Sequence, residues 1–189
     1  GGDFFQMRWT SLDAETDAGH AALTECELSG ASVERLDLTG ATLVDVSIEG
    51  MRATTVAARS ARLRRVRITG GRIGTLDLAD AEMDEVELRG VRVDYASLAS
   101  ARIADLLIAD CTIGTLDLPQ ATVARMAFAD SRADDVDTRG VRAKDLDLRG
   151  LEAVSYLDAG SLRGATLSTR QVEHLAPSLA AALGIRVID

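Results

Sequence analysis

Two histidines and two cysteines are the side chains best suited to nucleophilic or metal chemistry in this 189-residue chain. His20 and His174 lie near opposite ends of the sequence, and Cys26 and Cys111 lack the spacing of a metal-binding or redox pair. The sequence also lacks a Gly-rich phosphate loop and the HExxH and GxSxG motifs. We therefore predict no catalytic residue, no metal site and no cofactor, and we interpret both cysteines as buried structural thiols.

Charged side chains recur at intervals of 20 residues or multiples of 20. One series contains Asp37, Asp77, Asp117 and Asp137, and another contains Arg52, Arg72, Arg92 and Arg132. Carboxylates on a regular hydrated surface lack the cleft that tunes a pKa for acid-base catalysis. Two interpretations remain open. The acidic and basic faces pair across a corner and keep the protein hydrated, or the aspartates form a protein-binding surface.

A five-residue period positions these charges. From Leu23 to Ala153 every fifth residue is apolar except Thr138, and the residue two before each is apolar except Gly71 and Ser131. Neither a helix nor an ordinary strand keeps this period, whereas a chain that turns a corner every five residues does. Two residues of each pentad then point inward, the residue between them points outward, and two make the corner.

A longer period of 20 indicates four sides. Residues 20 apart form columns, such as Ala21, Ala41, Ala61, Ala81, Ala101 and Ala121 on one face and Cys26, Val46, Val66, Val86, Leu106, Met126 and Leu146 on the next. One corner repeats Gly30, Gly50, Gly70, Gly90 and Gly150, with Asp110 and Asp130 completing the column. A positive φ costs glycine little, so we expect that conformation at this corner.

The pentads Ala-Thr-Leu-Val-Asp (41–45), Ala-Arg-Leu-Arg-Arg (61–65) and Ala-Arg-Ile-Ala-Asp (101–105) resemble those of the pentapeptide-repeat family. The resemblance covers roughly residues 21–167. It implies an all-β solenoid, a right-handed quadrilateral β-helix with a short C-terminal helical cap. At ~4.8 Å per coil, about seven coils make a rod about 33 Å long.

Both ends depart from the period, and we interpret them as caps. Residues 1–20 form the N-terminal cap, residues 21–167 the β-helix and residues 168–189 a helical cap or dimerisation segment. We expect an apolar plug over the first coil from Phe4, Phe5, Met7, Trp9 and Leu12. The period slips by one residue near Tyr156, after which it continues at Leu157, Leu162 and Leu167. Ser168 and Gln171 then have capping-box spacing.

An apolar stripe in the last segment predicts a homodimer. Its members share one helical face: Val172, Leu175, Leu179 and Leu183. A continuous helix of about 22 Å is wider than one coil, so part of the stripe should overhang and become the dimer interface. The alternative is that Pro177 starts a second short helix, and that both helices lie flat on the coil.

The composition disfavours several classes of function. The net charge is -9 and the 21 basic residues are spread along the chain, which disfavours direct binding of nucleic acid. No apolar run reaches the length of a membrane span or a secretory leader, and two cysteines are too few for a disulfide framework. We predict a cytoplasmic, non-enzymatic protein-interaction scaffold with an unassigned partner and no membrane contact.

The alternative comes from the family resemblance. Some pentapeptide-repeat proteins are acidic rods that imitate duplex DNA and protect DNA gyrase from quinolones. This chain is similar in size, acidity and its C-terminal helical region, so DNA gyrase or another topoisomerase is the alternative partner. It differs in having Leu, Ile or Val where those rods favour Phe, since Phe128 is the only repeat Phe. Arginines also interrupt its acidic surface.

Overall fold

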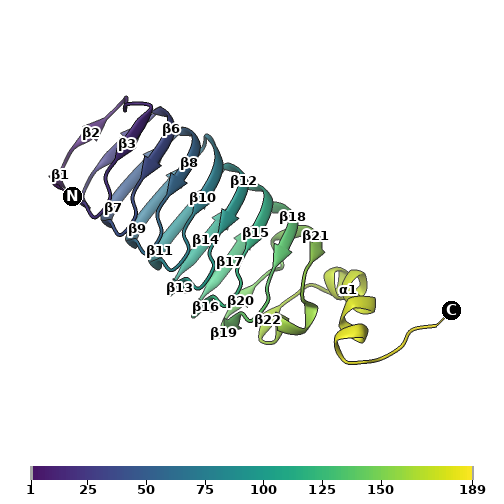
Figure 1. Cartoon of the computed structure of the whole chain (residues 1–189). Helices are drawn as coiled ribbons and strands as arrows, with labels where there is room; N and C mark the ends of the chain where they lie inside the picture. The colour runs from purple at the N-terminus through teal and green to yellow at the C-terminus, as the bar shows by residue number, and fades with distance from the viewer. Residues whose placement is uncertain (1, 189) are drawn as a thin grey trace.

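The computed structural model describes residues 2–188. It forms a rod with two sheets, and in each sheet parallel strands from successive coils lie side by side along the rod. Figure 1 shows the coils side by side, with helix α1 (Thr169–Ala182) beyond the last of them. Every strand pairing is parallel, and most join residues 20 apart, as in the row Val46, Val66 and Val86. The predicted four-pentad coil is therefore confirmed.

The two sheets wrap around one core. The larger sheet has 14 strands, and its main path runs through β1 (Asp3–Phe5), β4 (Ala22–Thr24), β7 (Thr42–Glu49), β9 (Arg62–Thr69), β11 (Glu82–Arg89), β14 (Leu106–Ala109), β17 (Met126–Ala129), β20 (Leu146–Asp147) and β22 (Ala165–Thr166). Beside this path lie β2 (Arg8–Trp9), β5 (Glu27–Ser29), β13 (Arg102–Ile103), β16 (Thr122–Val123) and β19 (Arg142–Ala143). The second sheet has eight strands, β3 (Glu15–Asp17), β6 (Ser32–Asp37), β8 (Arg52–Ala57), β10 (Arg72–Asp77), β12 (Arg92–Ser97), β15 (Thr112–Asp117), β18 (Ser131–Asp137) and β21 (Leu151–Tyr156), so the rod contains eight coils.

The core contains the inward residues of each pentad, as predicted. Ala41, Ala61, Ala81, Ala101 and Ala121 are all fully buried, and the opposite faces supply Leu, Ile, Val and Met. The exceptions to the sequence pattern have local explanations. The buried Thr138 hydroxyl donates to the carbonyl oxygen of Asp158 at 3.0 Å. The Ser131 hydroxyl donates to the carbonyl oxygen of Ala129 at 2.9 Å. At Gly71 a Cβ would lie 2.1 Å from the carbonyl oxygen of Met51, so only glycine fits.

The glycine corner differs from the prediction at one position. Gly30, Gly50, Gly70 and Gly90 have positive φ, and so do Asp110 and Asp130. Gly150 does not share that conformation. A Cβ there would lie 2.1 Å from the carbonyl oxygen of Phe128, so Gly150 is required for space and not for φ.

The N-terminal residues add a coil to the rod instead of lying over its end as a plug. Strands β1, β2 and β3 pair with β4, β5 and β6. Arg8 pairs with Glu27, 19 residues away, whereas Glu15 pairs with Arg35. The first coil is thus one residue short between Trp9 and Glu15, which explains why the period is lost in the sequence. Phe5 and Met7 remain exposed.

The C-terminal slip lies later than the sequence suggested. Tyr156 still pairs in register with Val136, and the shortened segment is a 3₁₀ helix, η1 (Ala159–Leu162). Leu162 is buried, but Leu157 is 53% exposed, so its predicted inward position is wrong. The capping box of Ser168 and Gln171 is confirmed, and α1 runs as one helix through Pro177. The two-helix alternative is therefore wrong.

No helix among residues 2–188 combines the length and the apolar composition needed to cross a membrane.

Candidate interaction surface

The aspartate series lies in one column of the eight-stranded sheet. The register places Asp17, Asp37, Ala57, Asp77, Ser97, Asp117 and Asp137 in successive coils. The column is therefore acidic but interrupted at Ala57 and Ser97.

These carboxylates support the corners that follow them. Asp37, Asp77 and Asp137 each accept a hydrogen bond from the backbone N–H two residues on, at distances of 2.9, 3.1 and 3.0 Å. Hydrogen bonds from Thr39, through its hydroxyl and its N–H, hold the pKa of Asp37 below its ordinary value. One oxygen of each carboxylate is thus used within the coil.

Asp117 is the exception because Pro119 has no N–H to donate. Its carboxylate instead accepts a hydrogen bond of 2.5 Å from the hydroxyl of Tyr95 in the preceding coil. This bond raises the pKa of Tyr95. Tyr95 is 38% exposed, so the sheet presents one aromatic ring beside the acidic column.

The arginine column does not pair with the aspartate column, and the predicted pairing across the corner is wrong. Arg72 binds Asp94 at 3.0 Å and Arg132 binds Glu152 at 3.2 Å. The aspartates have other partners, which are Arg35 for Asp37, Arg59 for Asp77 and Arg139 for Asp137. Arg92 lies 3.9 Å from Asp94. The two columns thus belong to separate sets of ion pairs.

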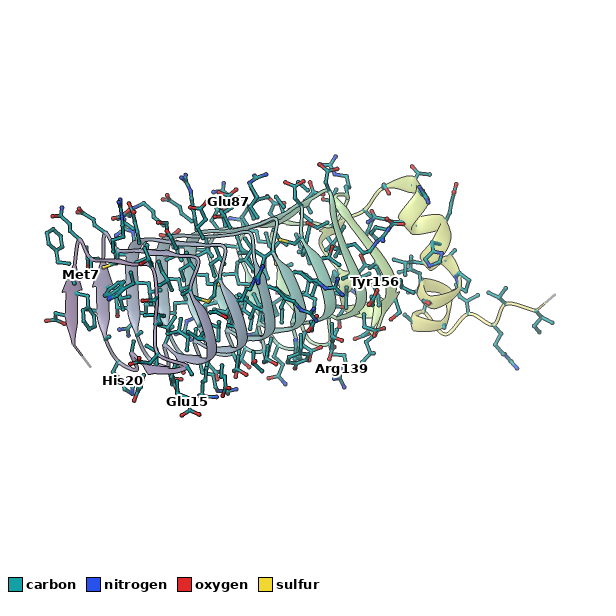
Figure 2. The ribbon with its side chains drawn as sticks, turned by 90° about the horizontal axis from the view of Figure 1, so that it is seen from above. Met7, Glu15, His20, Glu87, Arg139 and Tyr156 are labelled. Atoms are coloured by element: carbon teal, nitrogen blue, oxygen red, sulfur yellow. The ribbon has the colours of Figure 1, made fainter. Side chains whose placement is uncertain are left out.

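A concentrated basic segment was missed by the sequence reasoning, which treated the basic residues as evenly spread. Residues 50–76 contain no Asp or Glu and seven arginines: Arg52, Arg59, Arg62, Arg64, Arg65, Arg67 and Arg72. We call this segment the basic band. Figure 2 shows charged side chains projecting along the length of the rod. The sequence signal that could have revealed the pairing of this segment was the occurrence of opposite charges 20 residues apart, as at Asp45 and Arg65.

Acidic coils lie on both sides of the basic band and neutralise it. On one side Arg65 binds Asp45 through two nitrogens, at 2.5 and 2.7 Å. On the other, Arg62 lies 3.6 Å from Glu82 and Arg67 lies 3.5 Å from Glu87. The hydrogen bonds from Arg65 lower the pKa of Asp45, and that carboxylate raises the pKa of Arg65. The surface therefore carries rows of opposite charge along the rod axis.

A cleft of about 680 Å³ separates α1 from the last coils. It is lined by the corner residues of three coils, by β21 and by the first turns of α1. Strand β21 ends the eight-stranded sheet, so its outer edge has no neighbouring strand in the described chain. Gln171 covers the start of that edge, because its amide donates to the carbonyl oxygen of Leu151 at 2.9 Å. The same amide donates to the carbonyl oxygen of Leu148, in the turn before β21, at 2.7 Å.

The predicted apolar stripe of α1 divides between two environments. Leu175 is buried against the core at 5% exposure, and Leu179 is half-buried against it. Val172 and Leu183 are 43% and 78% exposed. Half of the predicted dimer stripe therefore attaches the helix to the rod, and the other half faces solvent.

The residues suited to catalysis are not brought together. Both cysteines are free and buried, as predicted, and burial raises the pKa of the Cys111 thiol. His20 lies in the turn near the N-terminal end, far from the helix that carries His174 (Figure 2). Within residues 2–188 no three His, Cys, Asp or Glu side chains are grouped as metal ligands.

Comparison with known proteins shows that this chain is similar to several solved structures. The sequence matches no family model and no curated protein. The chain is similar to HetL, a pentapeptide repeat protein involved in heterocyst differentiation regulation from the cyanobacterium Nostoc sp. strain PCC 7120. The identity is 14% and the TM-score 0.37, over 86% of this chain and 84% of that one.

It is also similar to QnrB1, a plasmid-mediated fluoroquinolone resistance protein. One trypsin-treated variant of QnrB1 gives 16% identity and a TM-score of 0.39 over 99% of each chain. A second gives 15% and 0.30 over 100% of each. Within this chain itself, the five-residue period and the parallel pairing of residues 20 apart agree from Ala21 to Tyr156. By that period and that coil, the chain is a pentapeptide-repeat β-solenoid.

Proposed function

We propose that the protein is a non-enzymatic scaffold that binds another protein through its outer surface. The observation that carries the proposal is the pairing of charges between neighbouring coils. Arg65 is held by two hydrogen bonds to Asp45, and Arg62 and Arg67 lie 3.6 and 3.5 Å from carboxylates in an adjacent coil. Side chains that are already ordered lose less entropy on binding, so such rows favour recognition by a surface of complementary charge.

A double charge swap tests the scaffold proposal. Asp45→Arg combined with Arg65→Asp keeps the ion pair and the net charge but inverts the local pattern. We expect the parent rod to capture a partner by cross-linking in its native host, and the swapped rod to lose that partner while keeping its melting temperature. Swapping Arg132 and Glu152 near the other end serves as the control. Equal capture by all three rods would contradict recognition through the basic band.

The alternative partner is DNA gyrase or another topoisomerase, bound by a rod that imitates DNA. Such imitation needs a continuous negative stripe. The aspartate column is interrupted at Ala57 and Ser97, and the basic band crosses the rod beside it. These features support a partner that recognises both signs of charge. We expect the purified protein to leave supercoiling by DNA gyrase unchanged at micromolar concentration, and inhibition of supercoiling would favour the alternative.

We further propose that two copies pair through the C-terminal segment. A helix of 14 residues is about 21 Å long, and Val172 and Leu183 near its two ends are left exposed although Leu175 and Leu179 pack against the rod. Beyond it Ile185, Val187 and Ile188 are 55, 69 and 84% exposed. Figure 1 shows this tail directed away from the rod. Apolar side chains in this number are costly in water, and two-fold pairing is a common way to bury them.

A further inference from the structure

The N-terminal end of the rod contains an apolar cavity of about 140 Å³. Phe4 and Trp9 form part of its wall, with ring centroids 5.5 Å apart and an interplanar angle of 79°. Leu12 and Leu23 also line it, and its inner end reaches core residues of the second and third coils, including Leu43. The cavity is remote from the basic band and from the C-terminal cleft.

The cavity arises because the first coil has small residues where the second coil has large ones. Thr16 pairs in register with Leu36, so a threonine ends a column that continues as Leu, Val and Leu. Two residues on, Ala18 precedes Leu38 in its column. The missing residue between Trp9 and Glu15 shortens the same side of the coil. The first coil therefore leaves the end of the core incompletely filled.

The polar groups in the lining already have partners. The Thr16 hydroxyl donates to the carbonyl oxygen of Asp13 at 3.0 Å, and Asp17 accepts from the N–H of Gly19 at 2.8 Å. Glu27 accepts from Arg8 at 2.7 Å. The buried Cys26 thiol points to the carbonyl oxygen of Thr24 at 3.3 Å. A water molecule needs two or more free polar partners to remain in such a space, so this lining favours an apolar occupant.

We propose that this cavity is a binding site for a small uncharged apolar molecule of about the size of benzene. An apolar cavity of about 150 Å³ in another protein is known to stay dry and to bind benzene or xenon. The present cavity has a comparable volume and an aromatic and aliphatic wall. A hydroxyl on the ligand would enter without a hydrogen-bond partner, so phenol should bind roughly tenfold more weakly than benzene.

Trp9 reports on occupancy because it is the only tryptophan in the chain. Bromobenzene quenches indole fluorescence on contact through its heavy atom. We expect titration with bromobenzene to give saturable quenching of Trp9, and unlabelled benzene to relieve that quenching in competition. Quenching that grows linearly up to the solubility limit, with no competition by benzene, would indicate random collisions and overturn the proposal.

A filling variant supplies the matched control. Ala18→Leu places a second leucine beside Leu38, in the cavity, and should remove the saturable quenching while raising the melting temperature. Ala104→Leu adds the same side chain at an exposed position and should leave the quenching intact. Saturable quenching that persists in Ala18→Leu would overturn the assignment to this cavity.

A second measurement keeps the test independent of how the filled variant folds. Benzene added to the parent protein should shift the methyl NMR signals of Leu36 and Leu38 through its ring current and leave those of Leu116 and Leu118 unchanged. The latter two are fully buried and lie four coils further along the rod. Shifts spread evenly over all four residues, or no shifts, would contradict the proposal.

Discussion

Tyr156 is a residue whose hydroxyl is buried without a hydrogen-bond partner in the described chain. Burial raises the pKa of this phenol to about 12, so it remains protonated at all ordinary pH values. The ring occupies an inward column in which Leu116 and Val136 precede it in the two previous coils. The hydroxyl therefore lowers the free energy of unfolding, whereas a phenyl ring at this position would not.

Tyr156→Phe tests this cost. Removal of an unpaired buried hydroxyl should leave the free energy of unfolding unchanged or raise it by about 1 kcal/mol. Urea unfolding followed by circular dichroism measures the change. A loss of stability by a similar amount would mean that the hydroxyl has a water or protein partner in solution.

Asp137 makes stability depend on pH. The guanidinium of Arg139 is the main cause that lowers its pKa, and the N–H of Arg139 adds to the effect. Since the folded pKa lies below the unfolded value, the unfolded state binds more protons as pH falls. The stabilisation is therefore complete above the ordinary pKa of 3.8 and is lost as pH falls through the folded value.

We expect Asp137→Asn to flatten this dependence. The parent protein should lose more unfolding free energy between pH 5 and pH 2 than the variant does, with the pH series measured by urea unfolding. Asp134→Asn, at an exposed position in the same strand, serves as the control. Parallel curves for the parent and Asp137→Asn would show that this carboxylate has the same pKa in both states.

At the scale of elements, the alanine column sets how closely one face approaches the core. Ala81 is fully buried between Ala61 and Ala101, which are fully buried as well. Larger side chains from other columns fill the interior instead. The column therefore has no space for a longer side chain.

Ala81→Leu should overpack this face and cost ~1–3 kcal/mol of unfolding free energy. Thermal melting followed by circular dichroism measures the change, and the exposed substitution Ala104→Leu is the control. Unchanged stability of the Ala81 variant would show that the coil expands at this face without strain.

The C-terminal helix depends on Gln171 for its attachment to the last coil. The amide nitrogen donates to two carbonyl oxygens of the coil, while the amide oxygen accepts from the N–H of Ser168 at 2.8 Å. One side chain therefore completes the helix cap and the open strand edge together.

Gln171→Glu separates the two roles, because a carboxylate retains the cap but donates nothing to the coil. We expect it to destabilise the protein by roughly 1–3 kcal/mol in urea unfolding, since it leaves the Leu151 carbonyl oxygen without its donor, while that of Leu148 keeps the N–H of Leu151. Arg170→Gln, one residue earlier and exposed, should have little effect. If both variants unfold at the same urea concentration, the helix is attached mainly through Leu175.

At the scale of the whole molecule, the homodimer proposal predicts a dimeric mass in light scattering at micromolar concentration. The variant Val172→Glu/Leu183→Glu should be monomeric with an unchanged melting temperature, because both side chains are exposed in one copy. Leu175 is unsuitable for this test since it is part of the core. A monomeric mass for the parent protein would rule out the dimer at that concentration.

The sequence alone determined the coil. Each pentad places two apolar residues inward, and residues 20 apart must stack because parallel strands align in register; the period therefore predicted the core, the buried cysteines and the alanine face. The capping box at Ser168 was also readable, since it depends on residues three positions apart. Local spacing was sufficient for all these features.

Only the tertiary structure showed how the two ends of the rod are built and which charged side chains pair on its surface. A coil that lacks one residue loses the period in sequence but still pairs through its backbone, so the apolar residues from Phe4 to Leu12 were mistaken for a plug. The ion-pair partners depend on side-chain reach between coils, as for Arg65 and Asp45, and not on the face that each column occupies. The N-terminal cavity and the burial of Leu175 depend on how volumes fill the ends of the rod, because there no further coil continues the repeat.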